Sequence, residues 1–329
     1  MGPAEQAAAA RRGAALFRLE EHGALVVSGG DRVRWLDGML TCDVARLAAA
    51  GRAVARALAL TRKGQIVADL CVWAQPAGLW LETERAALAG LFEHLRRHVA
   101  ADDVEIAGPD EERALLALEG PAAAAVLERA APGTPLPGVG GVAPVAIGGA
   151  EVALAGLGES AFRVALPAAL AERVEAALLA AGAPLGLVRG SREAREILRV
   201  EAGVPGFATE LAQGLLPAEA RLEAAICFDK GCYTGQEIVA RVASRAQIRR
   251  VLAGLRLAGP SAPEPGAGVL AGGEEVGRVT SGALSPAVGA IALALLRISH
   301  ASPGTELRVG PHPARVVPLP FVAPGARPG

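Results

Sequence analysis

Apolar and polar residues alternate in two different periods over roughly the first two hundred residues. Short apolar runs bounded by turn residues are typical of strands. These runs lie at 24–28, 54–60, 66–73, 79–82, 104–106, 114–118, 142–147, 151–155 and 161–166. Apolar residues at three- and four-residue spacing predict helices between them. The helices are expected at 31–40, 84–99, 122–129, 167–181 and 191–200. Asp31 and Thr83 are expected to cap the first two.

The pattern changes near residue 251, where short apolar runs are separated by clusters of Gly and Pro. That pattern is typical of a small all-β domain, expected over 251–321. Strands and helices before it do not alternate regularly as βαβ units. The sequence therefore predicts an α+β fold followed by a C-terminal β-barrel or sandwich.

Composition excludes several classes of protein. The 329 residues carry a formal net charge of -1, and 3% of them are aromatic, which argues against stable nucleic-acid binding. Four cysteines in a chain of this length do not make a disulfide scaffold. Residues 1–12 lack the apolar core of a secretory signal, and Gly and Pro interrupt the uncharged stretches 130–150 and 279–296. We expect a cytoplasmic protein that does not bind membranes.

The densest chemistry lies at 230–241, which includes the chain's only tyrosine, Tyr233. Gly231 and Gly235 permit backbone conformations closed to other residues. Lys230 lies two residues before Cys232, so its charge could favour the thiolate. The alternative is a tight turn that enters a strand, with a passive cysteine. Cys227 lies in an apolar run and is expected in the core.

Two further groups have alternative interpretations. His94 and His98 have a spacing that can bind a metal, but no carboxylate or cysteine accompanies them at ligand spacing. We therefore expect a solvated helix face and no metal site. A basic group could bind the polyglutamate tail of a ligand or form a solvated edge; it consists of Arg245, Arg249 and Arg250.

The segment KGCYTGQE resembles the signature of the YgfZ family of folate-binding proteins, which are related to the glycine cleavage T-protein. Its residues are Lys230, Gly231, Cys232, Tyr233, Thr234, Gly235, Gln236 and Glu237. Further segments resemble motifs of the same superfamily, in the same order. They lie at 36–44, 61–70, 116–121, 199–205 and 277–286. The signature is long enough to be specific, whereas each shorter segment alone is weak.

This resemblance implies ferredoxin-like α+β halves around a central hole that binds tetrahydrofolate or a one-carbon derivative. The folate-binding region would span 14–250, as two α+β subdomains, before the barrel at 251–321. By likeness to T-proteins, Glu201 would bind the pterin, since a carboxylate can accept two parallel hydrogen bonds. Arg199, Arg241 and Asp69 would complete the cofactor site. T-proteins carry paired aspartates where this chain has Ala68 and Asp69.

The leading functional hypothesis from the resemblance is a folate-binding factor that supports assembly or repair of iron–sulfur clusters in client enzymes, and linked tRNA modification. Cys232 would supply redox or thiol chemistry, with Asp69 as a second catalytic candidate. The alternative is a folate-dependent aminomethyltransferase of glycine cleavage. Cys232 and the incomplete aspartate pair favour the first and predict no glycine-cleavage turnover. A folate-dependent demethylase or oxidase module is weaker, because no dinucleotide-binding motif accompanies it.

Overall fold

The computed structural model describes residues 1–75, 78–245 and 248–323, with only the backbone for 243–245. The chain forms two compact units, each built from separated stretches. The two-sheet unit contains residues 9–190 and 224–236. The barrel unit contains residues 1–8, 191–223 and 237 onward. The N-terminal helix α1 (Pro3–Arg12) contributes residues to both.

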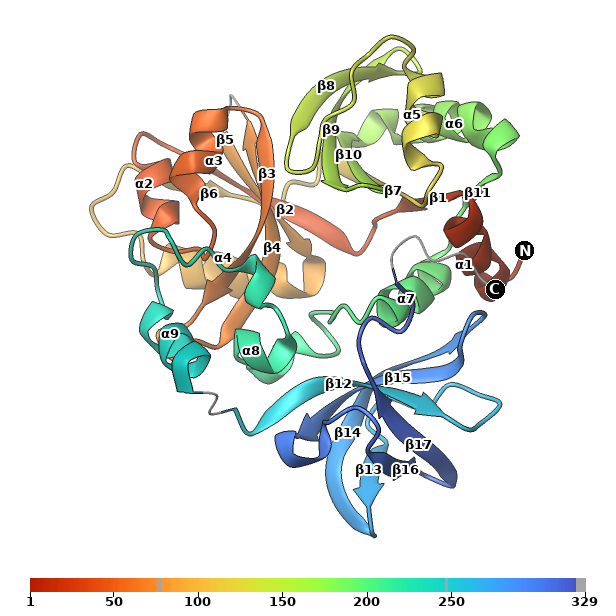
Figure 1. The fold of residues 1–329 in the computed structure, drawn as a ribbon. Coiled ribbons are helices and arrows are strands. Elements are labelled where there is room, and N and C mark those ends of the chain that lie inside the picture. The colour runs from red at the N-terminus through yellow and green to blue at the C-terminus, as the bar shows by residue number, and fades with distance from the viewer. Residues whose placement is uncertain (76–77, 246–247, 324–329) are drawn as a thin grey trace. The chain divides into compact units, whose positions relative to one another are not determined.

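The two-sheet unit holds two sheets (Figure 1). One has six strands in the order β11-β1-β7-β10-β9-β8, in which β1 and β11 are parallel and the other pairs antiparallel. Its strands are β1 (Ala14–Arg18), β7 (Arg113–Glu119), β8 (Val142–Ile147), β9 (Ala150–Gly158), β10 (Ala161–Pro167) and β11 (Leu187–Arg189). Its helices are α5 (Ala123–Ala130) and α6 (Ala171–Gly182).

The second sheet is antiparallel, in the order β3-β4-β5-β2-β6. Its strands are β2 (His22–Ser28), β3 (Ala53–Leu60), β4 (Ile66–Gln75), β5 (Gly78–Glu84) and β6 (Glu105–Ala107). The helices α2 (Arg32–Asp37), α3 (Val44–Ala50) and α4 (Arg85–Arg96) belong to this half of the unit. The face of α4 that carries Leu88, Leu91 and Leu95 is buried, as its spacing predicts.

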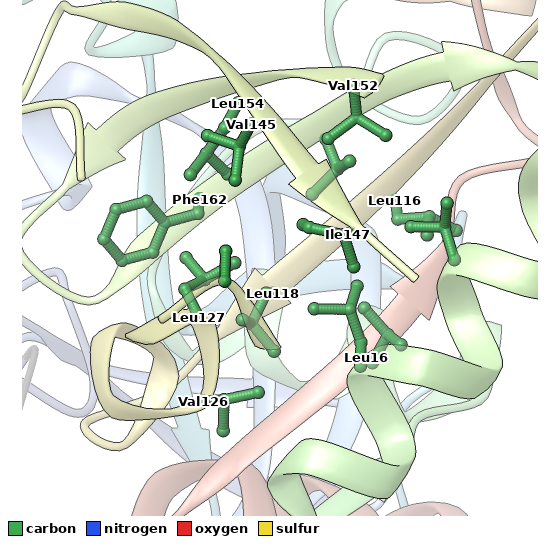
Figure 2. Close-up of a cluster of buried hydrophobic side chains, with 14 of the residues drawn as sticks. Leu16, Leu116, Leu118, Val126, Leu127, Val145, Ile147, Val152, Leu154 and Phe162 are labelled. Atoms are coloured by element: carbon green, nitrogen blue, oxygen red, sulfur yellow. The ribbon is translucent and has the colours of Figure 1, made fainter. Parts of the chain in front are cut away.

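The core of the first sheet shows how these elements pack (Figure 2). Alternate residues of β8, β9 and β10 point to one face, where they meet Val126 and Leu127 of α5. Leu16 of β1 and Leu118 of β7 lie in the same cluster. Burial of these apolar side chains joins strands that are far apart in the sequence.

The barrel unit closes six strands in the order β12-β15-β14-β13-β16-β17. They are β12 (Arg250–Leu257), β13 (Gly268–Ala271), β14 (Glu274–Ser285), β15 (Gly289–Arg297), β16 (Glu306–Val309) and β17 (His312–Val317). Its helices are α7 (Arg192–Glu201), α8 (Pro217–Ala220) and α9 (Gln236–Arg245), the last beginning at the final residue of the two-sheet unit. Short 3-10 turns occur in both units, at Ala168–Leu170, Ala183–Leu185, Leu211–Gln213, Glu223–Ala225 and Ile298–His300.

The α+β fold with ferredoxin-like sheets and a C-terminal barrel is confirmed. The central hole and the domain division at residue 250 stay predictions. The two helix caps predicted from the sequence are wrong. Thr83 lies inside β5 and does not cap α4, because its hydroxyl donates to the carbonyl of Asp69 (2.7 Å). Asp31 holds the cap position of α2, but its carboxylate accepts the N–H of Asp103 (2.9 Å) and makes no cap bond.

Candidate functional site

The 224–236 segment, which leads into α9, is part of the two-sheet unit and lies at the end of α2 and the β3–β4 turn. The N–H of Cys227 donates to the carbonyl of Thr41 (2.9 Å), and that of Thr234 donates to the carbonyl of Gly38 (3.0 Å). The Thr41 hydroxyl donates to the carbonyl of Ala225 (2.7 Å) and accepts the N–H of Leu58 (2.7 Å). Two motifs nearly 190 residues apart in sequence are thus hydrogen-bonded to each other.

Lys230 makes the strongest of these connections. Its side chain is 1% exposed, and its ammonium donates to the carbonyls of Asp37 (2.5 Å), Leu40 (3.0 Å) and Cys42 (2.7 Å). The Asp37 carboxylate accepts from it at 3.0 Å. These contacts use the charge of Lys230 to fix the backbone at the end of α2. The sequence predicted that the charge of Lys230 favours the Cys232 thiolate. In the structure the ammonium of Lys230 instead holds the backbone at the end of α2.

Gly235 is required by the close approach of the β3–β4 turn. Its φ is +87°, and a Cβ at this position would lie 2.6 Å from the carbonyl oxygen of Thr61. Tyr233 is buried, and burial raises the pKa of its phenol. After Gly235 the chain enters the helix α9 and not a strand, which corrects the sequence alternative.

The remaining signature residues are more open. Gly231, Cys232 and Glu237 are exposed, while Thr234 and Gln236 are half-buried. Cys227 is half-buried, so its expected core position is only partly correct. Burial raises the pKa of the Cys71 thiol. It raises the pKa of the Cys42 thiol to about 12, although the nearby ammonium of Lys230 opposes the shift.

We expect Cys232 to be alkylated at least about 100-fold faster than Cys42 in the native protein at pH 8. Cys232 is exposed, and a pKa near 12 lowers the thiolate fraction of Cys42 about 1,000-fold relative to an ordinary thiol. Mass spectrometry of iodoacetamide labelling measures both rates, and the unfolded protein, in which all four thiols react, is the control. Similar native rates for these two thiols would contradict the burial of Cys42.

Asp69 lies on β4 and is held by an arginine that sequence analysis missed. Arg56 of β3 donates through Nε to Oδ1 (2.8 Å) and through Nη2 to Oδ2 (2.5 Å). This two-point contact fixes the plane of the carboxylate. The β3–β4 register sets Arg56 diagonally across from Asp69, so a correct hairpin alignment could have identified the pair.

The adjacent residue Ala68 is fully buried, because side chains alternate along β4. An aspartate at position 68 would point into the core and not beside Asp69. The missing acid is therefore weak evidence against aminomethyl transfer, contrary to the expectation from the sequence.

Glu201 ends α7 in the barrel unit and is 2% exposed. Its carbonyl accepts the N–H groups of Phe321 (2.8 Å) and Val322 (3.3 Å), which ties the end of the helix to the chain after β17. Gly203 follows with φ +69°, where a Cβ would lie 2.9 Å from the Leu319 side chain. These contacts hold a buried carboxylate at a defined place.

Arg199, two residues earlier in α7, is the centre of a polar network. Its Nε and Nη2 bind the Glu196 carboxylate (2.7 and 2.5 Å), and Nη1 binds the carbonyl of Val204 (2.6 Å) and Glu210 (3.1 Å). Nη2 also donates to the hydroxyl of Ser281 (2.7 Å), which donates to Glu210 (2.7 Å). All five guanidinium donors are thus used within the protein. The network joins the 199–205 and 277–286 motifs, and direct contact of Arg199 with folate stays a prediction.

Other sequence candidates lie apart from these groups. Arg241 is exposed on α9, Arg249 is exposed and Arg250 is half-buried, and the side chain of Arg245 lies outside the described residues. His94 and His98 are half-buried and not on a solvated face. Their ring centres are 4.8 Å apart, and burial lowers the pKa of His94 to about 4. Within the described chain, no cluster of three or more His, Cys, Asp or Glu could hold a metal.

Among the helices of the described residues, none combines the length and apolar character needed to cross a membrane.

Comparisons with known proteins cover nearly the whole chain. Residues 2–230 match the GCVT N-terminal domain, and residues 250–323 match the glycine cleavage T-protein C-terminal barrel domain. An aminomethyltransferase of Rubrobacter xylanophilus is 37% identical over 95% of this chain and 84% of its own length. One of Streptomyces avermitilis is 33% identical over 95% of this chain and 87% of its own length.

A solved structure has the same fold. It is the glycine cleavage system aminomethyltransferase T from Bartonella henselae, with a TM-score of 0.86 and 24% identity over 98% of this chain and 90% of that one. At this identity the likeness shows the fold alone.

These relatives overturn the leading functional hypothesis. The expected factor for iron–sulfur clients and tRNA modification is wrong, because the full-length relatives carry the name aminomethyltransferase. YgfZ-type specificity is not confirmed. The physical reason lies in the signature, where Lys230, Tyr233, Thr234 and Gly235 make packing contacts and so report the fold more than the reaction. The two domain matches and the full-length relatives together place this chain in the glycine cleavage T-protein family.

Proposed function

We propose that this chain is a folate-dependent aminomethyltransferase of the glycine cleavage type. The observation that carries the proposal is the similarity to aminomethyltransferases at 31–37% identity over at least 94% of the chain. The substrates would be tetrahydrofolate and a carrier protein bearing an S-aminomethyl group on its lipoyl arm. Transfer of the methylene carbon to folate would release the carrier thiol and ammonia.

Aminomethyltransferases of this family use tetrahydrofolate, in agreement with the cofactor expected from the sequence. The residues present fit such a ligand. A pterin offers two parallel N–H donors, and the buried carboxylate of Glu201 can accept both without competition from bulk water. When bound, tetrahydrofolate supplies the two nitrogens that accept the one-carbon unit.

The remaining candidates would act on position and charge. Arg199 would be a positioning residue, because its contacts hold the end of α7 that carries Glu201. Asp69 would present a carboxylate whose orientation is set by Arg56. Cys232 has no assigned step in this reaction. The YgfZ likeness remains a resemblance of the signature, and the cytoplasmic location stays a prediction.

The direct test supplies the protein with aminomethylated lipoyl carrier protein and tetrahydrofolate. We expect folate-dependent formation of methylenetetrahydrofolate and ammonia, with a turnover on the order of 1 per second or faster. The control omits tetrahydrofolate. A folded protein that binds tetrahydrofolate but gives no folate-dependent ammonia release would overturn the proposal.

Glu201→Gln is expected to raise the dissociation constant of tetrahydrofolate about 10- to 100-fold. The amide keeps the size of the side chain but loses the charge and one of two acceptor positions, at a cost of about 1.5–3 kcal/mol. Calorimetric titration measures the change. Glu193→Gln, at an exposed position on the same helix, is the control. Equal affinities of the wild type and Glu201→Gln would remove Glu201 from the site.

A further inference from the structure

A cavity of about 220 Å³ lies within the two-sheet unit, away from the residues discussed above. Its lining comes from the end of β1, the start of β2, the strands β4 and β5, and the segment that leads into β7. Neither Asp69 nor any residue of the signature borders it. Drug-sized ligands usually occupy about 300–1,000 Å³, so this cavity suits a ligand with a single ring.

Two tryptophans form an aromatic wall. The ring centres of Trp73 and Trp80 are 6.2 Å apart, with 35° between their planes. The guanidinium carbon of Arg113 lies 3.5 Å from the centre of the Trp80 ring. Asp110 accepts from Nε of Arg113 at 2.6 Å, which holds this guanidinium over the indole. The wall therefore combines apolar ring surface with a fixed planar guanidinium, whose charge Asp110 balances.

Glu82 also borders the cavity, where an unbalanced carboxylate would repel an anion. It is 3% exposed, accepts from Nε1 of Trp73 (2.9 Å) and forms an ion pair with the guanidinium of Arg163. The Nδ1 atom of His22 lies 3.2 Å from its Oε1. Arg163 offsets the charge of Glu82, so this carboxylate does not set the charge preference of the cavity.

Two more arginines border the cavity, and their carboxylate partners are largely in water. Nη1 of Arg85 lies 3.0 Å from Oε1 of Glu111, whose side chain is 66% exposed. Nε of Arg18 lies 3.8 Å from Oε1 of Glu20, whose side chain is 80% exposed. Such exposed ion pairs contribute little to stability. An incoming carboxylate can therefore replace a glutamate at either guanidinium, while the displaced glutamate stays hydrated.

We propose that this cavity binds a small planar anion of the aromatic or heteroaromatic carboxylic acid class. The ring would lie against Trp80 and the apolar lining, next to the buried Trp73, and the carboxylate would face Arg85 and Arg113. Planar guanidinium groups match the two oxygens of a carboxylate, which favours this anion over a point charge. The proposal does not depend on the proposed aminomethyltransferase activity.

The test uses nuclear magnetic resonance of the indole N–H groups in the full chain. The protein has three tryptophans, and the indole of Trp35 bonds the carbonyl of His98, outside the cavity lining. Benzoate is the probe, with benzyl alcohol and benzylamine as its neutral and cationic counterparts. We expect saturable shifts of the Trp73 and Trp80 signals with benzoate, no shift at Trp35, and at least 10-fold weaker binding of both counterparts.

Arg85→Met and Arg113→Met should each weaken benzoate at least 10-fold. Arg315→Met removes an exposed arginine paired with Glu306 in the barrel unit and should leave the affinity unchanged. Arg85 is half-exposed, so its variant keeps the test valid if Arg113→Met does not fold. Equal affinities for benzoate and benzyl alcohol would overturn the proposal, as would a wild-type protein whose signals do not saturate, or benzoate binding that both arginine variants retain.

Discussion

Lys230→Met is expected to lower the free energy of unfolding by about 3–5 kcal/mol. The substitution removes a buried ammonium and leaves three carbonyls and the Asp37 carboxylate without their shared donor. Urea denaturation followed by circular dichroism measures the change. The chain has only one other lysine, Lys63, which is exposed in the β3–β4 turn, so Lys63→Met is the matched control.

A loss below about 1 kcal/mol for Lys230→Met would mean that water or a neighbouring group replaces the ammonium at little cost. The close contacts of Lys230 with the end of α2 would then not explain why the 224–236 segment groups with the two-sheet unit.

Arg163→Met should lower the free energy of unfolding by a similar amount, about 3–5 kcal/mol. Arg163 of β10 is buried and pairs with Glu82 of β5, so its loss leaves a buried carboxylate without its cationic partner. This pair also joins the six-stranded and five-stranded sheets. Urea denaturation again gives the measurement, and Arg173→Met, on α6, is the control for loss of an arginine outside this pair.

The double variant Arg163→Met with Glu82→Met sharpens the test. Because an apolar pair of similar volume does not carry the cost of burying charges, we expect it to recover a large part of the lost stability. If the double variant loses more free energy of unfolding than the two single variants lose together, Glu82 acts through Trp73 and His22 more than through Arg163.

The period of apolar residues determined most elements by itself. The helical spacing of Leu88, Leu91 and Leu95 predicted α4, and the apolar runs on either side of the 61–64 turn predicted the β3–β4 hairpin. Short apolar runs between Gly and Pro clusters after residue 251 predicted a small all-β domain, a barrel or a sandwich. Each of these signals is local, because a buried face repeats at the period of its own helix or strand.

Only the tertiary structure decided what the polar residues do. Lys230 finds its partners almost 190 residues earlier in the chain, and nothing in the local spacing distinguishes this from a role beside Cys232. Ala68 stands where T-proteins have an acid, but the alternation of β4 places its side chain in the core. Arg56, Ser281 and Glu210 were missed for the same reason. A hydrogen bond or ion pair depends on how strands and helices pack, and apolar periodicity alone does not encode those pairings.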